Sequence, residues 1–203
     1  DLKSIGASYV NYLTLDLKDL DKHKDIFDKA RDEMDGFDHI LIAHGTLPDQ
    51  VKCEKSISDT LEEFNSNALS VISILTYASN FFEEKSNGVI IAISSVAGDR
   101  GRKSNYVYGS AKGAVSLFMQ GLRARLTDKG VRVITIKPGF VDTNMTAEFK
   151  KNFLWTSPEK VAKGIKKATD SKRVDVIYLP KYWKYIMLIV KLIPEFIFKK
   201  LNL

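Results

Sequence analysis

The run Gly88–Ile93 constrains the fold of this chain more than any other stretch. It is short, has no polar side chain and is rich in β-branched residues, which is typical of a strand buried on both faces of a parallel sheet. Residues 37–43 form a second buried run, and residues 131–137 and 175–179 also have strand character. Because helical segments separate these runs, the sequence predicts an α/β fold with a Rossmann-type, doubly wound parallel sheet.

The segments around these strands have patterns of their own. Residues 9–17 alternate between apolar and polar side chains, which favours a further strand, and residues 18–34 have the spacing of a charged amphipathic helix. Asp59 and Glu62 form a capping-box pattern at the start of a long helix. Another long helix is expected to contain Tyr108 and to follow the strand Gly88–Ile93.

Tyr108 and Lys112 stand four residues apart in this expected helix, so the phenol and the ammonium lie on one face. Ser95 follows the end of the central strand, at the edge where open α/β sheets bind their ligands. A hydroxyl at a strand end beside a Tyr/Lys pair predicts a carbonyl-reducing site. The alternatives are a Tyr/Lys pair on the surface and a Ser95 that only caps the strand end.

Two further features extend this spacing. Ser95 lies 13 residues before Tyr108, Asn67 lies 28 before Ser95, and Pro138 of a Pro-Gly pair lies 30 after Tyr108. With these residues the chain resembles the short-chain dehydrogenase/reductase family over nearly its whole length. The resemblance implies an NAD(P)-dependent oxidoreductase that reduces a ketone to an alcohol. It implies four catalytic residues, namely Asn67, Ser95, Tyr108 and Lys112.

Each of these residues has an expected role. Tyr108 is the general acid, and its phenol, with a free pKa near ~10, needs a lowered pKa to trade protons at neutral pH. The charge of Lys112 is expected to supply that lowering. Ser95 is expected to stabilise the oxyanion that forms as hydride arrives. The resemblance implies that Lys112 also holds the nicotinamide ribose and that Asn67 holds a water that relays protons to it, with Asn65 as the competing candidate.

The resemblance also implies a site for NAD or NADP. Residues 43–45 stand where the family has Asn-Asn-Ala-Gly, and residues 16–17 match an acidic-apolar pair that touches adenine. Alternatives are a satisfied strand-end histidine, a turn residue at Asp16 and a simple Pro-Gly turn. The expected cofactor-binding residues are Asp16, Leu17, Ala43, His44, Gly45, Tyr108, Lys112, Pro138, Gly139, Val141 and Thr143.

The Gly-rich turn that cradles a cofactor pyrophosphate, G-x-x-x-G-x-G in this family, does not occur in the sequence. In the family's strand order, 3-2-1-4-5-6-7, this chain supplies strands 3 to 7, so the first βαβ unit is absent from it. A gap in a sheet is costly because it leaves buried backbone groups unpaired. We therefore expect about fifty residues, the size of a βαβ unit, to precede Asp1. Without them residues 9–17 should be displaced, or paired with another chain, and the pyrophosphate site should be absent. The preference for NADH or NADPH lies in that missing part.

Three cations, Arg100, Arg102 and Lys103, lie between Ser95 and Tyr108. We expect them at the mouth of the site, where they bind a phosphate of the substrate. The alternative is a charged loop that is simply solvated. Residues 145–155, which are rich in apolar side chains, follow a strand end and are expected to form a substrate lid.

Residues 181–203 combine a run of aromatic and aliphatic side chains with flanking lysines. The apolar run is too short to cross a bilayer, so the pattern predicts a helix that lies on a membrane surface. The alternative is a contact with another subunit, in a homo-oligomer or with a partner subunit. We therefore divide the chain into a reductase domain, residues 1–180, and this C-terminal segment.

Composition limits the setting of the protein. A single Cys53 gives no disulfide framework and fits a reducing compartment, and the first residues have no signal-peptide pattern. The formal net charge of +6 suits an anionic membrane surface or a phosphorylated substrate. The cations do not gather into one stripe, so no nucleic-acid partner is expected, and no metal ligands are assigned. The expected location is the cytoplasm, including peripheral contact with the inner face of the membrane.

Within the family, the stretches 94–112 and 137–143 and the tail are similar to one subgroup. This is the reductase subunit of decaprenylphosphoryl-β-D-ribose epimerase, which reduces a keto-sugar carried on a polyprenyl phosphate. The resemblance implies a lipid-linked substrate and a partner epimerase subunit. The alternatives are a soluble reductase of an unrelated ketone or acyl substrate, and a non-catalytic partner subunit.

Overall fold

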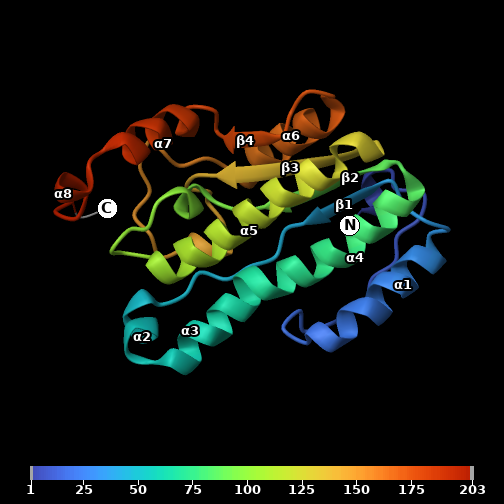
Figure 1. Cartoon of the computed structure of the whole chain (residues 1–203), viewed down its shortest axis with the longest axis horizontal. Coiled ribbons are helices and arrows are strands. Elements are labelled where there is room, and N and C mark those ends of the chain that lie inside the picture. Colours follow the sequence, from blue (N-terminus) through green and yellow to red (C-terminus); the bar gives the residue numbers. More distant parts are fainter. Residues whose placement is uncertain (1, 202–203) are drawn as a thin grey trace.

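The computed structural model describes residues 2–201 and contains a parallel sheet in the order β1-β2-β3-β4 (Figure 1). The register places Ile40 beside Ile90, and Ile90 beside Val133. All four strands lie where their apolar runs predict them, so the Rossmann-type α/β fold is confirmed. The strands are β1 (His39–Ile42), β2 (Gly88–Ile93), β3 (Val131–Pro138) and β4 (Val176–Leu179).

Helices cover both faces of the sheet, as the unbroken apolar run of β2 requires. On one face, Leu75, Phe82 and Met119 pack against Ile90 and other strand residues in the main core. On the other face, α6 contributes buried residues to a second core that contains Ile91 and Ile134. The helices are α1 (His23–Glu33), α2 (Gln50–Lys55), α3 (Ile57–Phe64), α4 (Ser70–Lys85), α5 (Tyr106–Leu126), α6 (Pro158–Asp170), α7 (Trp183–Leu192) and α8 (Glu195–Phe198).

The carboxyl ends of the strands point toward the edge where α7, α8 and the first turn of α5 lie (Figure 1). A third apolar cluster forms there from Val96, Trp183 and Met187. Each parallel strand therefore delivers the residue that follows it to the same edge. This arrangement assembles the site from segments that are far apart in the sequence.

Residues 9–17 do not form the strand that their alternation suggests. In the described part of the chain, β1 pairs with β2 and residues 9–17 have no ladder partner. An extended segment without a neighbouring strand gains no ladder hydrogen bonds, so local alternation is not enough to make a strand.

Two helix starts also differ from the sequence prediction. The long helix begins at Ile57 and not after Asp59, because the Ser56 hydroxyl accepts a hydrogen bond from the backbone N–H of Asp59 at 3.2 Å and so acts as the N-cap. The helix expected over residues 18–34 is α-helical only over α1, after a 3₁₀ turn at residues 20–22.

A π turn, Asn65–Leu69, separates α3 from α4. Such single π turns insert an extra residue into a helix and often occur at functional sites. This one includes Asn67, which is completely buried, whereas Asn65 is half-buried and donates to the backbone carbonyl of Lys18 at 3.3 Å. The turn therefore settles which of the two asparagines faces the interior.

Candidate active site

Ser95 is held at the end of β2 by the 3₁₀ helix η4 (Val96–Asp99). Its hydroxyl accepts a hydrogen bond from the backbone N–H of Ala97 at 3.1 Å. η4 packs directly on α5, since a Cβ atom at Gly98 would lie 2.7 Å from the backbone of Lys112 and Gly113. Glycine at this point allows the close approach that brings Ser95 to Tyr108 and Lys112. The preceding Ser94 is structural, with its hydroxyl donating to the Lys112 carbonyl at 2.9 Å.

Tyr108 lies in the first turn of α5, with the Nζ atom of Lys112 5.8 Å from its ring centroid. Burial raises the pKa of the Tyr108 hydroxyl, and a hydrogen bond with Ser95 and the charge of Arg102 act against this rise. The sequence prediction gave the lowering of this pKa to Lys112. The structure contradicts that prediction in direction as well as in partner, because burial raises the pKa of Tyr108 and the charge that opposes this rise belongs to Arg102, six residues before the tyrosine.

Lys112 is 3% exposed, and burial lowers its pKa to about 8. Its Nζ atom donates to the carbonyl of Ile93 at a long distance of 3.4 Å. A Cβ atom at Gly45 would lie 3.0 Å from this Nζ and 2.8 Å from Oδ1 of Asn67. Glycine at position 45 therefore keeps a crevice open in front of the amine. An amine with one long hydrogen bond retains donors for ribose hydroxyls, so these residues fit the nicotinamide ribose of NAD(P).

Asn67 is completely buried beside Lys112, and its amide is fully engaged. Oδ1 accepts from the backbone N–H of Thr46 at 3.0 Å, and Nδ2 donates to Oγ1 of Thr46 at 2.8 Å. Nδ2 also lies 3.2 Å from the carboxylate of Glu63, which accepts a hydrogen bond from the Thr46 hydroxyl at 2.5 Å. Sequence reasoning missed Thr46 and Glu63. The signal for Glu63 was its position four residues before Asn67, on the same helix face.

His44 has structural partners. Its Nε2 lies 2.8 Å from the Ser70 hydroxyl, which itself donates to the carbonyl of Ser66, so the imidazole is the donor to Ser70. Burial and the nearby charge of Lys112 lower its pKa to about 4, which keeps the ring neutral at neutral pH. This is the satisfied strand-end histidine that the sequence left open. Ala43, directly before it, is exposed.

The loop after β3 begins with Pro138 and Gly139. The Trp183 indole lies against Gly139, where a Cβ atom would be 1.9 Å from its Nε1, and this Nε1 is buried without a described hydrogen-bond partner. Val141 is half-buried and forms an isolated bridge with Thr156. Thr143 is exposed and precedes a short 3₁₀ turn, with its backbone N–H donating to the Thr146 hydroxyl at 3.1 Å.

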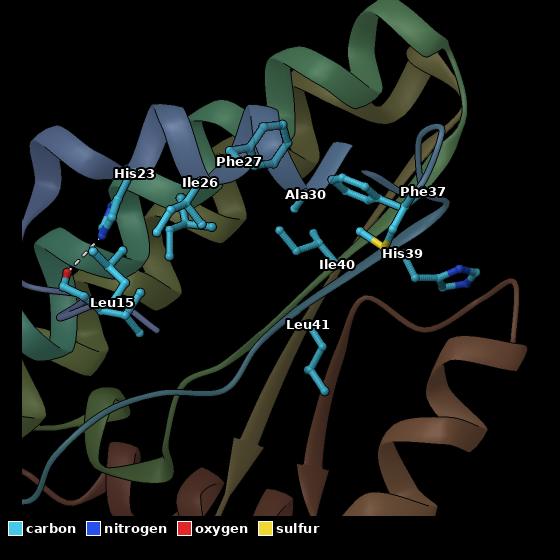
Figure 2. Close-up of a pocket in the computed structure, with 12 residues that line it drawn as sticks. Leu15, His23, Ile26, Phe27, Ala30, Phe37, His39, Ile40 and Leu41 are labelled. Atoms are coloured by element: carbon cyan, nitrogen blue, oxygen red, sulfur yellow. Dashed lines mark hydrogen bonds between the residues drawn. The ribbon is translucent and has the colours of Figure 1, made fainter. Parts of the chain in front are cut away.

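Asp16 and Leu17 lie in a turn and not at a strand end. The Asp16 carboxylate accepts from the backbone N–H of Lys18 at 3.0 Å, which makes it the turn residue that the sequence left as an alternative. Leu17 lines an apolar cavity of about 280 Å³ beside β1, together with His23 and Phe27 (Figure 2). None of the four predicted catalytic residues lines this cavity.

The three cations of the loop after Ser95 separate in space. Arg100 does not face the site, because its guanidinium bonds the carbonyls of Val190 and Ile193, each at 2.6 Å, and the Glu195 carboxylate at 2.9 Å. The prediction that Arg100 binds substrate is therefore wrong, since these groups use its donors. Arg102 is half-buried toward Tyr108, with its Nε unpartnered among the described residues. Lys103 is exposed.

A buried ion pair connects the two loops of this edge. Asp99, at the end of η4, forms a salt bridge with Lys137 of β3 and accepts a hydrogen bond from the Tyr178 hydroxyl at 2.6 Å. The Asp99 and Lys137 side chains are 3% and 13% exposed. Burial and the adjacent carboxylate raise the pKa of Tyr178. The Ser95 loop is thus fastened to the strands that carry the Pro138–Gly139 loop.

The geometry brings together Ser95, Tyr108 and Lys112 at the carboxyl edge, with Asn67 buried behind the amine. A parallel Rossmann-type sheet with this group at its edge defines the class, an α/β oxidoreductase. Residues 1–153 match the family model described as short chain dehydrogenase. The chain belongs to the short-chain dehydrogenase family.

Individual relatives agree with this assignment. An uncharacterized oxidoreductase of Mycobacterium tuberculosis (strain ATCC 25618 / H37Rv) is 30% identical over 201 residues, which is 98% of this chain and 80% of the relative. An acetoacetyl-CoA reductase of Cupriavidus necator is 27% identical over 136 residues, 67% of this chain and 55% of that enzyme. The solved structure of ElxO with NADP bound has a TM-score of 0.77 at 23% identity, and covers 91% of this chain and 83% of that one. These comparisons establish the family and the fold, and not the subgroup.

Proposed function

We propose that this protein reduces a ketone to a secondary alcohol with NADPH or NADH. The observation that carries the proposal is the meeting of Ser95, Tyr108 and Lys112 at the carboxyl edge of the sheet. The cofactor, when bound, supplies a hydride to the carbonyl carbon. ElxO and a short chain dehydrogenase from Burkholderia cenocepacia carry NADP in their solved structures, which supports a cofactor of this class.

The side chains of this chain supply the proton and the charge stabilisation. The Ser95 hydroxyl donates to the substrate oxygen and stabilises the developing oxyanion. The Tyr108 hydroxyl, which hydrogen-bonds Ser95, transfers its proton to that oxygen. Lys112 would hold a ribose hydroxyl of the bound cofactor, because its amine makes one long hydrogen bond and lies beside the crevice that Gly45 leaves open. Ser95 and Lys112 are themselves buried, which strengthens their electrostatic interactions.

Binding of the nicotinamide half of the cofactor rests on residues of this edge. We assign it to Ala43, Gly45, Tyr108, Lys112, Pro138, Gly139, Val141 and Thr143. The adenosine half is assigned to Asp16, Leu17 and His44, although Asp16 and His44 already have structural partners.

The substrate that we propose is a keto-sugar on a polyprenyl phosphate. A half-buried Arg102 beside Tyr108 supports an anionic group close to the reacting ketone, and the exposed Lys103 adds charge at the entrance. Reaction with such a carrier places the protein in the cytoplasm, peripherally on the inner face of the membrane, with a partner epimerase subunit or a second copy of itself. No helix in the described part of the chain is long and apolar enough to cross a membrane.

A ketoacyl thioester is the second candidate substrate. The acetoacetyl-CoA reductase among the relatives favours this substrate, and the phosphates of a coenzyme A group would also suit Arg102. A non-catalytic partner subunit is the third reading, and the assembled Ser/Tyr/Lys group argues against it.

The proposal is tested with the full-length protein by following oxidation of NADPH and NADH with lipid-linked keto-sugars, ketoacyl thioesters and uncharged ketones. Tyr108→Phe removes the proton donor and keeps the ring, so turnover should fall by about 10²-fold or more while cofactor binding remains. Tyr106→Phe, on an exposed residue of the same helix, is the matched control. Near-normal turnover of Tyr108→Phe would overturn the reaction, and faster turnover of thioesters would replace the keto-sugar.

A further inference from the structure

α7 is apolar on two opposite faces, and only one of them is covered. Trp183, Ile186, Met187 and Val190 face inward and pack in the cluster that contains Val96. Tyr185, Leu188, Ile189 and Leu192 follow the i, i+3, i+4, i+7 pattern of a second face, and their exposed fractions are 67%, 53%, 65% and 72%. A helix of a soluble domain normally presents polar residues on its outer face. The outer face of α7 instead presents large apolar side chains to solvent.

The exposed apolar surface continues onto α8. Phe196 and Ile197 are 66% and 42% exposed, while Phe198 is buried against the body of the protein. We call Tyr185, Leu188, Ile189, Leu192, Phe196 and Ile197 together the tail surface. Six large exposed apolar side chains on two consecutive helices are more than single scattered residues, which need no explanation, and they mark a surface of interaction.

Lysines surround the tail surface. All five are exposed and none forms an ion pair with a described residue. Glu195, the acidic residue of α8, is already paired with Arg100. The surface therefore combines an apolar centre with an uncompensated positive rim. The lysines are Lys181, Lys184, Lys191, Lys199 and Lys200.

The tail surface is held in a fixed orientation by Arg100. The Arg100 guanidinium donates hydrogen bonds to the carbonyls at the end of α7 and forms a salt bridge with Glu195. It also lies 3.7 Å from the centroid of the Phe198 ring. Arg100 belongs to the loop between Ser95 and Tyr108, so the same loop positions the active site and the tail. α7 and α8 accordingly lie at the carboxyl edge of the sheet (Figure 1).

We propose that the tail surface docks on an anionic lipid bilayer, with α7 and α8 lying in the plane of the headgroups. An apolar face flanked by aromatic and lysine side chains is the pattern of an interfacial helix. The charges decide between a membrane and a second copy of the chain. Two tail surfaces that met face to face would bring ten lysines together, whereas an anionic membrane surface neutralises them. Docking needs neither cofactor nor substrate, so it is separate from the proposed reaction.

Sedimentation of the full-length protein with vesicles tests this proposal. Vesicles of phosphatidylcholine with phosphatidylglycerol should bind it, and vesicles of phosphatidylcholine alone should bind it more weakly. Leu188→Gln/Ile189→Gln/Leu192→Gln should weaken binding by roughly tenfold or more. The matched control is Val51→Gln/Ile57→Gln/Leu61→Gln, which changes three residues that are also exposed, at 58%, 73% and 61%, and should bind normally.

The lysines are tested in the same assay. Lys184→Gln/Lys191→Gln/Lys199→Gln should lower affinity for anionic vesicles by roughly fivefold for each charge, and Lys163→Gln/Lys166→Gln/Lys167→Gln on α6 should change it less. Circular dichroism verifies that each variant is folded.

Two outcomes would overturn the proposal. One is that the protein does not bind either kind of vesicle. The other is that the apolar tail variant converts an oligomer into a monomer by light scattering and leaves vesicle binding unchanged, which would assign the tail surface to a second copy. Because no substrate is present, neither outcome bears on reduction of a ketone.

Discussion

The Arg102 guanidinium and the Tyr108 hydroxyl lie close enough for the charge of one to lower the pKa of the other. Arg102→Met removes that charge, so the pKa of Tyr108 should rise further. In the direction of alcohol oxidation, where the tyrosinate is the active base, the pH at which kcat/KM reaches its plateau should move upward. Arg102→Lys should restore part of the shift, and Lys103→Met, which changes an exposed neighbour, should leave the profile in place. An unchanged profile in Arg102→Met would contradict this pairing.

Burial of the Lys112 amine should destabilise the folded protein when no cofactor is bound. Its pKa is about 8 in the folded state and 10.5 in the reference state, so the unfolded chain binds the extra proton more readily between these pH values. The free energy of unfolding therefore rises as the pH increases from about 8 to above 10.5. Below pH 8 the destabilisation caused by the buried Lys112 amine is fully present. Lys112→Met should stabilise the protein at pH 7 by about 2 kcal/mol, while turnover is lost.

Urea unfolding at pH 7 and pH 10 measures this effect, with Lys129→Met, on an exposed lysine, as the control. The gain from Lys112→Met should shrink at the higher pH. A destabilised variant, or a gain that does not depend on pH, would show that burial of the amine is compensated in the folded protein.

The sheet was predictable because its signal is local. The run Gly88–Ile93 is apolar at every position, and burial on both faces leaves few alternatives to a central parallel strand. The segment 9–17 was not predictable in the same way. Its alternation is as regular, but a strand also needs a neighbour, and that neighbour is a property of the tertiary structure.

The site divides in a similar manner. The relation between Tyr108 and Lys112 follows from helix geometry, and that of Ser95 follows from its strand end. The separation of Arg100 from Arg102 does not, because two residues in one loop carry no periodic signal. Arg100 donates hydrogen bonds to the carbonyl groups at the end of α7, and these contacts join residues some ninety positions apart in the sequence.

Asp99 should be essential for the stability of the loop that carries Ser95. Asp99→Asn removes the partner of Lys137 and leaves a buried cation, which should lower the free energy of unfolding by about 3 kcal/mol. Lys137→Met in the same protein removes the stranded charge and should restore part of the loss. Asp128→Asn, on an exposed residue of the 3₁₀ turn that follows α5, is the control. Equal stability of Asp99→Asn and the control, measured by urea unfolding, would show that water solvates the Lys137 ammonium once Asp99 no longer pairs with it.

The hydrogen bonds that the Glu63 carboxylate accepts from Thr46 and Asn67 should set the orientation of the Asn67 amide beside Lys112. Glu63→Gln keeps the shape but replaces the acceptor-only carboxylate by an amide that also donates, so the Thr46–Asn67 pair must rearrange. Turnover should fall by roughly tenfold, with little change in the KM for the ketone, because the altered group lies behind the amine and not against the substrate.

Glu62→Gln is the matched control for this prediction, since Glu62 is adjacent to Glu63 in the sequence but its carboxylate pairs with Lys18. Steady-state kinetics and urea unfolding of both variants separate the two possible effects. A loss of stability with kcat unchanged would show that Glu63 only supports the fold of the π turn. A lower kcat in Glu63→Gln but not in Glu62→Gln, at normal stability, would establish that turnover depends on the orientation of the Asn67 amide beside Lys112.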